Sequence, residues 1–362
     1  MKRCTRGAAI AVAAVSMAAG LTACGGGGGS GDDQEGTEIG LLLPDSTTAR
    51  WETYDVPLLK KEIKERCGDC TVVHANAKGD VATQRQQVDS MITEGVDAMV
   101  LVAVDARSLG AAVRKADQAG IPVIAYDRLA EGPISGFVTF DAEEVGRLQG
   151  RALLEALGDR ADGGQIVVMN GDPSDPNSIS FKKGALSVLS DRVKIGKMYD
   201  TPLWRAEVAN KNMSGAISAL GADTIDGVYA ANDGLAAGSI SALKANKVTP
   251  LPPVTGQDAE LGALRRIVGG DQHMTVYKPF GPEASAGAAM AVAAARGENL
   301  DEIATDEVRT SDGKEVPAVL LTPVSVTVGN IRDTLVKDGV YTIQQICTPQ
   351  LRAACDRVGL TA

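Results

Sequence analysis

The sequence predicts an α/β protein with two lobes, each a doubly wound parallel sheet covered by helices. Short apolar runs alternate with longer amphipathic stretches along most of the 362-residue chain, and this alternation occurs in two series. Runs that are apolar on both faces are typical of parallel strands buried between helices. Because parallel strands are joined by helical crossovers, two such series indicate two doubly wound sheets.

The first series begins at Glu38. Its apolar runs predict strands, and the amphipathic stretches between them predict the crossover helices. The predicted strands are 39–43, 71–74, 98–102, 122–125 and 137–140, and the predicted helices are 53–66, 82–94 and 108–119.

The second series has the same rhythm and predicts a second lobe of the same kind. The predicted strands are 166–169, 193–198, 228–230, 254–255 and 274–277, and the predicted helices are 178–189, 206–220, 235–245 and 261–268.

A weak internal similarity between two stretches of the sequence supports the division into two lobes. The stretches from Asp97 to Asp127 and from Asp226 to Asp258 each run from a strand, through an Ala-rich helix, to a second strand that ends at an aspartate. Ligands of open α/β sheets bind beyond the carboxyl ends of the strands. Two such edges facing one another predict a ligand-binding cleft between similar lobes.

The start of the chain has the features of an export signal. Lys2, Arg3 and Arg6 precede the apolar run 7–19, which is too short to span a bilayer. We therefore expect a signal peptide over residues 1–23 that is absent from the mature protein.

Residues 21–24 read Leu-Thr-Ala-Cys, which resembles the lipobox of bacterial lipoproteins. The resemblance implies a diacylglyceryl group on Cys24, whose two acyl chains would anchor the exported protein to the outer face of the cell membrane. Residues 24–37 are rich in glycine and predict a flexible tether. An ordinary secretory signal with a chance cysteine is the alternative.

The composition excludes several classes of partner. Without the leader the chain has 33 basic and 46 acidic residues, a net charge of −13, which argues against nucleic acids and anionic membrane surfaces. Aromatic residues make up only 3% of the chain and include two tryptophans, Trp51 and Trp204. A binding surface built on many aromatic side chains is therefore excluded.

The cysteines divide into groups with different expected roles. One leaves with the signal peptide, and Cys24 is the predicted lipid site. Cys67 and Cys70 would indicate a redox or metal motif in a cytosolic protein, but outside the membrane a local disulfide is favoured. Cys347 and Cys355 would then form a second disulfide that fastens the C-terminal tail.

The sequence lacks the common signatures of catalysis and metal binding. It contains no Gly-x-x-x-x-Gly-Lys-Ser/Thr phosphate loop and no Gly-x-Ser-x-Gly elbow between a strand and a helix. Its two histidines, His74 and His273, have no ligand spacing to a cysteine and leave little for a Ser-His-Asp arrangement. We therefore expect no enzymatic activity, no cofactor and no metal.

The stretch from Asp172 to Asn177 could suggest a calcium loop. Pro173 and Pro176 disturb the ligand spacing, and no later glutamate completes it. These residues instead predict a turn that caps the following helix.

Polar residues recur at the predicted carboxyl ends of the strands. Carboxylates, guanidinium groups and amides there can bind the hydroxyl groups of a sugar, and a tryptophan can cover the C–H face of its ring. Structural roles compete: Asp141 fits a helix capping box, and Asp233 and Asp258 fit helix N-caps. The strand-end candidates are Asp127, Arg128, Asp141, Asn232, Asp233, Asp258 and Lys278, with Trp51 and Trp204 as the aromatic candidates.

Short motifs spread over residues 38–341 occur together. They are Ala49–Trp51, Ala125–Arg128, Phe140–Asp141, Val145–Gly146, Ala231–Asp233, Gly256–Ala259, Met274–Pro279, Leu321–Pro323 and Ile331–Thr334. In this combination they resemble the periplasmic sugar-binding proteins of ABC importers.

The resemblance implies a type I periplasmic binding protein fold, in which three hinge crossings join the two lobes. It assigns 38–140 and about 279–304 to the first lobe, 141–278 and about 305–340 to the second, and 341–362 to a disulfide-bonded tail. It also implies a monomer that holds one monosaccharide, D-xylose, in the cleft and delivers it to a membrane permease served by a separate ATPase. The ligand-binding residues that it implies are Arg50, Trp51, Asp127, Arg128, Asp141, Asn177, Trp204, Asn232, Asp258 and Lys278.

Two alternatives stay open at the level of sequence. A sensor subunit that binds another pentose or a hexose would use the same site. An exported sugar-processing enzyme would use two of the cleft carboxylates as acid and base.

Overall fold

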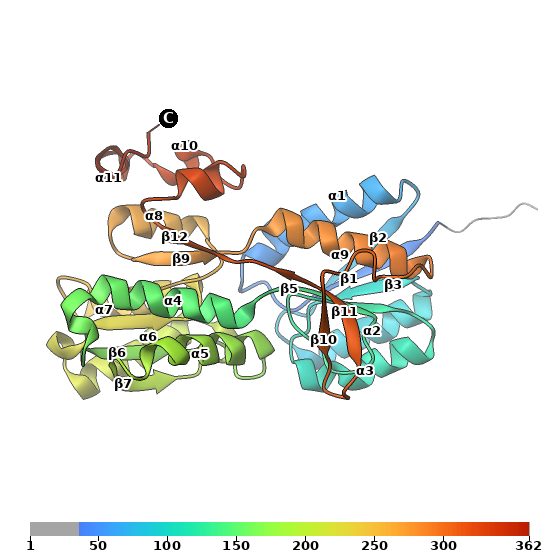
Figure 1. Cartoon of the computed structure of the whole chain (residues 1–362), viewed down its shortest axis with the longest axis horizontal. Coiled ribbons are helices and arrows are strands. Elements are labelled where there is room, and N and C mark those ends of the chain that lie inside the picture. The colour runs from blue at the N-terminus through green and yellow to red at the C-terminus, as the bar shows by residue number, and fades with distance from the viewer. Residues whose placement is uncertain (1–35, 362) are drawn as a thin grey trace, which may run out of the picture. The chain divides into compact units, whose positions relative to one another are not determined.

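Two layered α/β lobes make up residues 36–361, the part of the chain that the computed structural model describes (Figure 1). Both have the doubly wound arrangement that the alternating pattern predicts. The predicted signal peptide, the predicted lipid site Cys24 and residues 24–35 of the predicted tether lie outside the described residues.

The first lobe contains a seven-stranded sheet with helices on both faces. Its strands are β1 (Glu38–Leu43), β2 (Thr71–Asn76), β3 (Ala98–Leu101), β4 (Val123–Tyr126), β5 (Gly136–Phe140), β10 (Asp306–Arg309) and β11 (Glu315–Leu321). Its helices are α1 (Val56–Arg66), α2 (Val81–Glu94), α3 (Ala106–Gln118) and α9 (Phe280–Ala295).

The strands of this sheet lie in the order β10-β11-β5-β4-β3-β1-β2, and only the β10–β11 pair is antiparallel. Successive side chains of a strand point to opposite faces. On β1, Leu41 accordingly packs with residues of α1 and α9, while Leu42 packs with residues of α2 and α3. The sheet is therefore buried on both faces, which explains its continuous apolar runs.

The second lobe has a sheet in two parts. Its strands are β6 (Gln165–Met169), β7 (Lys194–Tyr199), β8 (Gly227–Ala230), β9 (Met274–Tyr277) and β12 (Val324–Thr327). Its helices are α4 (Ala142–Leu157), α5 (Pro176–Leu189), α6 (Ala206–Leu220), α7 (Asp233–Ala245) and α8 (Leu261–Gly269).

Strands β7, β6 and β8 pair in parallel, and β9 pairs antiparallel with β12. The predicted strand 254–255 is reduced to a single bridge between Val254 and Val228. Backbone hydrogen bonds still join this segment to β9 and to the residue before it. The His273 N–H donates to the Val254 carbonyl over 2.9 Å, and the Val276 N–H donates to the Gly256 carbonyl over 3.1 Å. Residues 254–258 thus connect the two parts of the sheet.

The chain passes between the lobes three times, after β5, after β9 and after β11. The first two crossings follow Phe140 and Tyr277, and the third follows Leu321, so the expected boundary near residue 304 is wrong. Residues Ala318–Leu321 of β11 pair with Phe137–Phe140 of β5, so the first lobe continues to Leu321. The physical reason is burial: Val319 packs on the α1–α9 side and Ala318 on the α2–α3 side, which makes β11 a full member of the first sheet.

Two long helices, α4 and α9, have no counterpart among the predicted ranges. Both depend on small residues for close packing. A Cβ on Gly146 of α4 would lie 2.0 Å from the Phe181 carbonyl oxygen of α5, and a Cβ on Gly287 of α9 would lie 2.8 Å from the Tyr126 ring. Helix α9 is rich in alanine and glycine and carries a weak amphipathic signal, because small apolar side chains occur on all its faces. Helix α4 is amphipathic, and the predicted ranges omit it.

The cysteine pairs that the sequence predicts are disulfide-bonded. Cys67 and Cys70, with Cα atoms 5.2 Å apart, close the turn between α1 and β2. Cys347 and Cys355, with Cα atoms 6.0 Å apart, join the short tail helices α10 (Ile343–Ile346) and α11 (Arg352–Arg357). Among residues 36–361 we find no helix with the length and apolar character needed to cross a bilayer.

Candidate ligand-binding site

A pocket lined by residues of both lobes lies at the carboxyl ends of the strands. The first lobe contributes the loops after β1 and β4, and the second contributes the loops after β6, β7, β8 and β9. This is the edge at which the doubly wound topology predicts ligand binding. The predicted site residues that line the pocket are Trp51, Asp127, Arg128, Asn177, Trp204, Asn232, Asp258 and Lys278.

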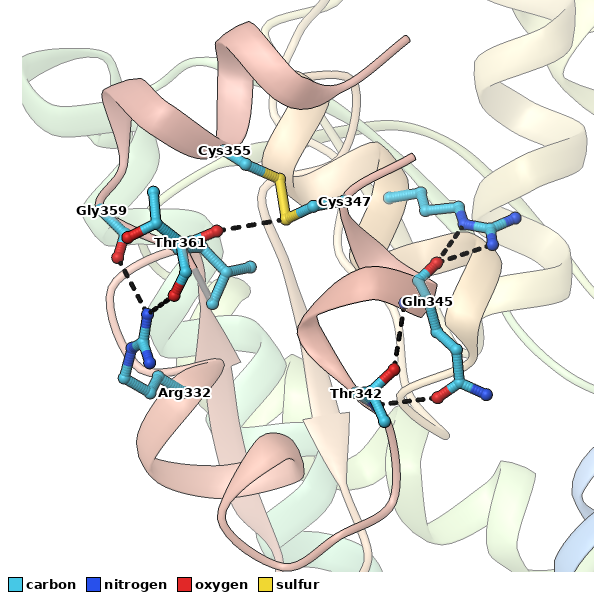
Figure 2. Close-up of a disulfide and its surroundings, with 9 residues drawn as sticks. Arg332, Thr342, Gln345, Cys347, Cys355, Gly359 and Thr361 are labelled. Carbon is cyan, nitrogen blue, oxygen red and sulfur yellow. Dashed lines mark hydrogen bonds between the residues drawn. A yellow bond between two sulfur atoms is a disulfide. The ribbon is translucent and has the colours of Figure 1, made fainter. Parts of the chain in front are cut away.

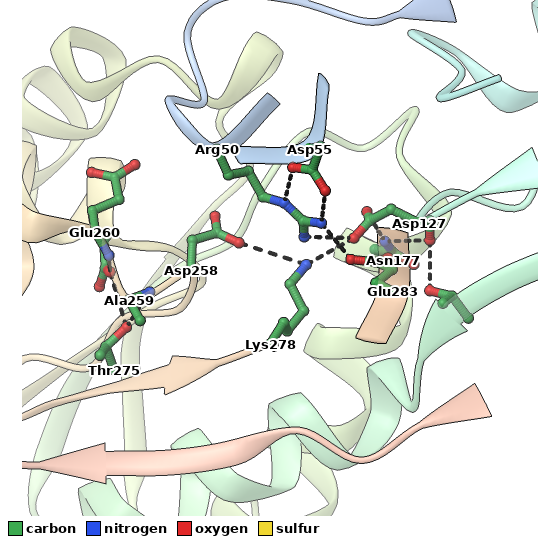
Figure 3. A network of polar contacts seen from close by, with 12 residues as sticks. Arg50, Asp55, Asp127, Asn177, Asp258, Ala259, Glu260, Thr275, Lys278 and Glu283 are labelled. Atoms are coloured by element: carbon green, nitrogen blue, oxygen red, sulfur yellow. Dashed lines mark hydrogen bonds and ion pairs between the residues drawn. The ribbon is translucent and has the colours of Figure 1, made fainter. Parts of the chain in front are cut away.

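Asp127 is the centre of the polar network in this pocket (Figure 3). One carboxylate oxygen accepts from Arg50 Nη1 and from Lys278 Nζ, both over 2.9 Å, and the other accepts from Asn177 Nδ2 over 2.8 Å. Burial alone would raise the pKa of Asp127, but the cations Lys278, Arg50 and Arg128 outweigh it and lower that pKa to about 2. Asp127 is therefore ionised and connects the two lobes.

Arg50 lies behind Asp127 and does not line the pocket. Arg50 is 2% exposed, and its guanidinium contacts three acidic side chains, those of Asp55 at 2.8 Å, Asp127 at 2.9 Å and Glu283 at 2.5 Å. The prediction that Arg50 touches the ligand is not supported by this position. Its contacts instead tie the loop after β1 to α9 and fix the orientation of the Asp127 carboxylate.

Glu283, on α9, is the least satisfied acid of this cluster. One carboxylate oxygen contacts Arg50, while Oε1 is buried without a partner among the described residues. Burial raises the pKa of Glu283 to about 8; Arg50 opposes the shift, and the neighbouring acids Asp127 and Asp55 add to it.

Replacing Glu283 by Gln is expected to flatten the pH dependence of stability. The raised pKa means that folding favours the neutral carboxyl, so its contribution is full below the ordinary value of 4.5 and is lost as the pH rises through about 8. Melting temperatures measured from about pH 5 to about pH 9 should fall more steeply for the wild type than for Glu283→Gln. Parallel pH profiles would contradict the assignment.

A second contact between the lobes joins Arg128 to Asp175. Arg128 Nε lies 2.8 Å from Asp175 Oδ2, and the Trp204 indole N–H donates to the same oxygen over 3.1 Å. Asp175 also caps α5 by accepting from the Asn177 N–H over 2.9 Å. The turn predicted between Asp172 and Asn177 thus caps a helix and also meets the first lobe.

The two tryptophans line the pocket from different lobes. Trp51 is 2% exposed, and the guanidinium carbons of Arg50 and Arg128 lie 4.5 and 5.5 Å from its ring centroid. Trp204 is 6% exposed and packs edge-on against Phe181, with ring centroids 6.4 Å apart. These contacts hold both rings in place and leave the pocket with an aromatic wall on each side.

Asn232 and Asp258 complete the second-lobe side of the pocket. The side-chain carbonyl of Asn232 caps α7 by accepting from the Leu235 N–H over 2.9 Å, which leaves its amide N–H groups for a ligand. Asp258 is 4% exposed and lies 3.6 Å from the Lys278 ammonium. Asp233, which also fits an N-cap in the sequence, is fully buried behind this edge.

Asp141 is not part of the pocket. Its side chain is 50% exposed, caps α4 by accepting from the Glu144 N–H over 2.8 Å, and lies 3.2 Å from Arg147. Of the two interpretations of Asp141, the structure supports the helix cap. The physical reason is that its short side chain is hydrogen-bonded to the backbone at the start of α4, just past the first hinge crossing, and so lies away from the pocket.

The pocket also contains residues that were not predicted from the sequence. Gln257 directly precedes Asp258 in the same motif, and its buried Oε1 has no partner among the described residues. Asp175 belongs to a turn for which only a capping role was expected. The unassigned lining residues are Thr48, Asp175, Phe181 and Gln257.

Within residues 36–361, one cluster has the ligand types and spacing to hold a metal ion: Cys67, Asp69 and Cys70. The two sulfur atoms of this cluster are bonded to each other. Because a metal-binding cysteine must be a thiolate, the cluster does not fit a metal in this state.

Comparison with known proteins agrees with this geometry. Residues 39–299 match the family described as "Periplasmic binding protein domain". The chain is 36% identical over 310 residues to the D-xylose-binding periplasmic protein of Escherichia coli, which covers 84% of this chain and 91% of that protein. It is 32% identical over 333 residues to the xylitol-binding protein of Mycolicibacterium smegmatis, with 90% and 88% covered.

Among solved structures, an ABC transporter solute binding protein from Clostridium phytofermentans with bound β-D-glucose has a TM-score of 0.79 and 30% sequence identity to this chain. The alignment covers 86% of this chain and all of that chain.

Proposed function

The chain belongs to the periplasmic binding protein domain family, and on that premise we propose that it is the sugar-binding component of an ABC importer, with D-xylose as its ligand. The observation that carries the proposal is the interlobe pocket, in which carboxylates, cations and amides alternate between two tryptophans. Its occupant is a small, neutral molecule rich in hydroxyl groups.

The chemistry of the pocket suits a sugar. Carboxylates such as Asp127 and Asp258 accept from hydroxyl groups, Arg128 and Lys278 donate to them, and amides can do both. An aromatic ring covers the apolar C–H face of a pyranose. A site that pairs every hydroxyl rejects a sugar that lacks one, because the buried protein group is then left unpaired.

The choice of D-xylose rests on the identity to the D-xylose-binding periplasmic protein. Relatives include a xylitol-binding protein and a solute binding protein with bound β-D-glucose, so the family accommodates several polyols and sugars. A thermal-shift screen of the mature protein against D-xylose, xylitol, arabinose, ribose, glucose and galactose tests the proposal. A ligand that binds only the folded state raises the melting temperature. We expect the largest rise with D-xylose, and no rise with any of them would overturn the sugar-binding function.

Closure of the two lobes follows from the position of the ligand. Asp127 and Arg128 belong to the first lobe, while their partners Asn177 and Asp175 belong to the second. A sugar that touches both sets stabilises the closed arrangement and shifts the population toward it. The closed protein is then the form that a permease would receive.

The pKa of Asp127 suits a binding role for this carboxylate. The general acid of a sugar-cleaving enzyme must keep its proton near neutral pH, which requires a raised pKa. The cations around Asp127 lower its pKa to about 2. This carboxylate therefore accepts hydrogen bonds and does not deliver a proton.

We also propose that Cys24 carries a lipid anchor. Replacing Cys24 by Ala should release most of the exported protein from the membrane fraction, because the two acyl chains are lost. The measurement is the distribution of wild type and variant between membrane and soluble fractions of a bacterial host that processes lipoproteins. Equal distribution of the two proteins would contradict the anchor, and sugar binding should be the same in both.

A further inference from the structure

The turn that presents Asp258 to the pocket has an unfavourable backbone conformation. Asp258 and Ala259 have φ angles of +95° and +51°, and both are buried. Positive φ is disfavoured for residues with a Cβ, because the Cβ approaches the neighbouring carbonyl oxygen. The surrounding structure must therefore hold this turn in place.

Three backbone N–H groups of the turn are bound by the second lobe, and Figure 3 shows Ala259 beside one of the partners, Thr275. The Asp258 N–H donates to the Val276 carbonyl over 2.9 Å, and the Ala259 N–H donates to Thr275 Oγ1 over 3.1 Å. The Glu260 N–H donates to the buried carboxylate of Asp233 over 2.9 Å. These contacts fix one side of the turn.

The opposite side is held by a residue far along the chain. The Tyr341 hydroxyl donates to the Ala259 carbonyl over 3.1 Å, and the tyrosine is only 4% exposed. Its ring packs edge-on against Tyr54, with centroids 6.0 Å apart. Tyr341 thus supplies a buried hydrogen bond to the carbonyl of the second left-handed residue.

The disulfide-bonded tail that follows Tyr341 is attached to the rest of the lobe, and Figure 2 shows its Thr342–Gln345 contacts and its disulfide. Thr342, the next residue, forms a capping box with Gln345 at the start of α10, and Arg265 of α8 donates to the Gln345 carbonyl over 3.1 and 2.7 Å. Arg332 donates to the Gly359 carbonyl over 3.3 Å. The tail is thereby attached to α8, the helix that follows the strained turn.

Apolar packing adds to this attachment. Ile346, Ala354 and Leu360 of the tail share one buried cluster with Leu264 and Ile267 of α8. The Cys347–Cys355 disulfide joins the two tail helices, and Cys355 is itself part of that cluster. The tail therefore packs against α8 and supports the helix that begins just after Asp258.

We propose that Tyr341, anchored by the disulfide-bonded tail, is a positioning residue that holds the Asp258–Ala259 turn in the conformation that binds the ligand. The inference rests on the proposed sugar-binding function. Without the hydroxyl, the buried Ala259 carbonyl loses a partner and the turn relaxes toward conformations in which Asp258 points elsewhere. The apparent dissociation constant then rises in inverse proportion to the fraction of molecules with the competent turn.

The test compares Tyr341→Phe with Tyr229→Phe. Tyr229 is a matched control, because its buried hydroxyl has no hydrogen-bond partner among the described residues, so the same chemical change removes no bond. Tyr341→Phe should raise the dissociation constant for D-xylose about three- to tenfold, the effect of one hydrogen bond. Tyr229→Phe should leave it unchanged.

Binding kinetics separate positioning from direct contact. If the turn interconverts quickly between conformations, Tyr341→Phe lowers the apparent association rate and leaves the dissociation rate unchanged. Unchanged affinity would overturn the proposal, and so would a loss of affinity carried only by faster dissociation. Far-UV circular dichroism and the melting temperature establish that each variant is folded.

A second pair of variants tests the anchor. Replacing both Cys347 and Cys355 by Ser should weaken D-xylose binding in the same way, whereas replacing Cys67 and Cys70 by Ser, at the other disulfide, should not. Equal affinities in the two double variants would overturn the role of the tail. If the wild type binds no sugar, the proposed function fails; if the wild type binds and every variant matches it, only the positioning role fails.

Discussion

Replacing Arg50 by Met is expected to lower the free energy of unfolding by about 3–5 kcal/mol, the usual cost of removing one partner from a buried ion pair. Arg50 is 2% exposed, and its guanidinium is in contact with Asp55, Asp127 and Glu283. Its removal leaves the Asp55 and Asp127 carboxylates in a low-dielectric environment with one fewer cation. Equilibrium unfolding in urea, with a two-state fit, measures the change.

Arg147→Met is the matched control for this variant. Arg147 also has three carboxylate partners, at 3.2, 3.5 and 2.6 Å, but its side chain is 30% exposed. Water and salt screen such a pair, so the loss should be below about 1 kcal/mol. Similar losses for the two variants would contradict the claim that burial makes the Arg50 cluster essential.

Replacing Asp258 by Asn is expected to weaken D-xylose binding about a hundredfold, which is the effect of losing one strong charge-assisted hydrogen bond. Asparagine tolerates positive φ at least as well as aspartate, so the turn at φ +95° is preserved. The charge opposite Lys278 and one of the acceptors for ligand hydroxyls are lost. Isothermal titration calorimetry measures the affinity.

Asp271→Asn serves as the control for the binding measurement. Asp271 is a partly exposed aspartate of the same lobe that pairs with Lys244 and does not line the pocket. Its replacement should leave the affinity for D-xylose unchanged. A wild-type affinity in Asp258→Asn would remove Asp258 from the binding site.

The sequence was sufficient to predict the fold class and the edge of the sheets that carries the site. Both follow from periodicity and topology: buried parallel strands are apolar on both faces, and polar residues such as Asp127 and Asp258 come directly after them. The motif resemblance then implied two tryptophans in the site, and both line the pocket.

The sequence could not distinguish neighbours that face different ways. Arg50 and Trp51 are adjacent, but only Trp51 reaches the pocket, because successive residues at the start of a helical turn point in different directions. Asp141 has the sequence features of a helix cap and of a ligand residue, and only its position at α4 decides between them. The pairing of β11 with β5 could not be predicted from a local sequence pattern, because it depends on which of the two sheets has an open edge.

Contacts between segments that are far apart in the chain could also not be predicted from the sequence. The bond from Tyr341 to the Ala259 carbonyl spans 82 residues, and the pairing of Arg128 with Asp175 joins two lobes. Asp175 was expected to form only a turn, because a residue that caps a helix carries no signal for a second partner. These contacts arise from the packing of whole elements.

Tryptophan fluorescence during titration with D-xylose tests the central claim most directly. The chain has two tryptophans, Trp51 and Trp204, and both line the interlobe pocket from opposite sides. A sugar bound there must change their surroundings, so we predict a saturable change in emission that corresponds to one sugar per protein. The size of this emission change should be smaller in each single Trp→Phe variant. A rise in melting temperature with no change in emission would place the ligand outside this pocket and contradict the account.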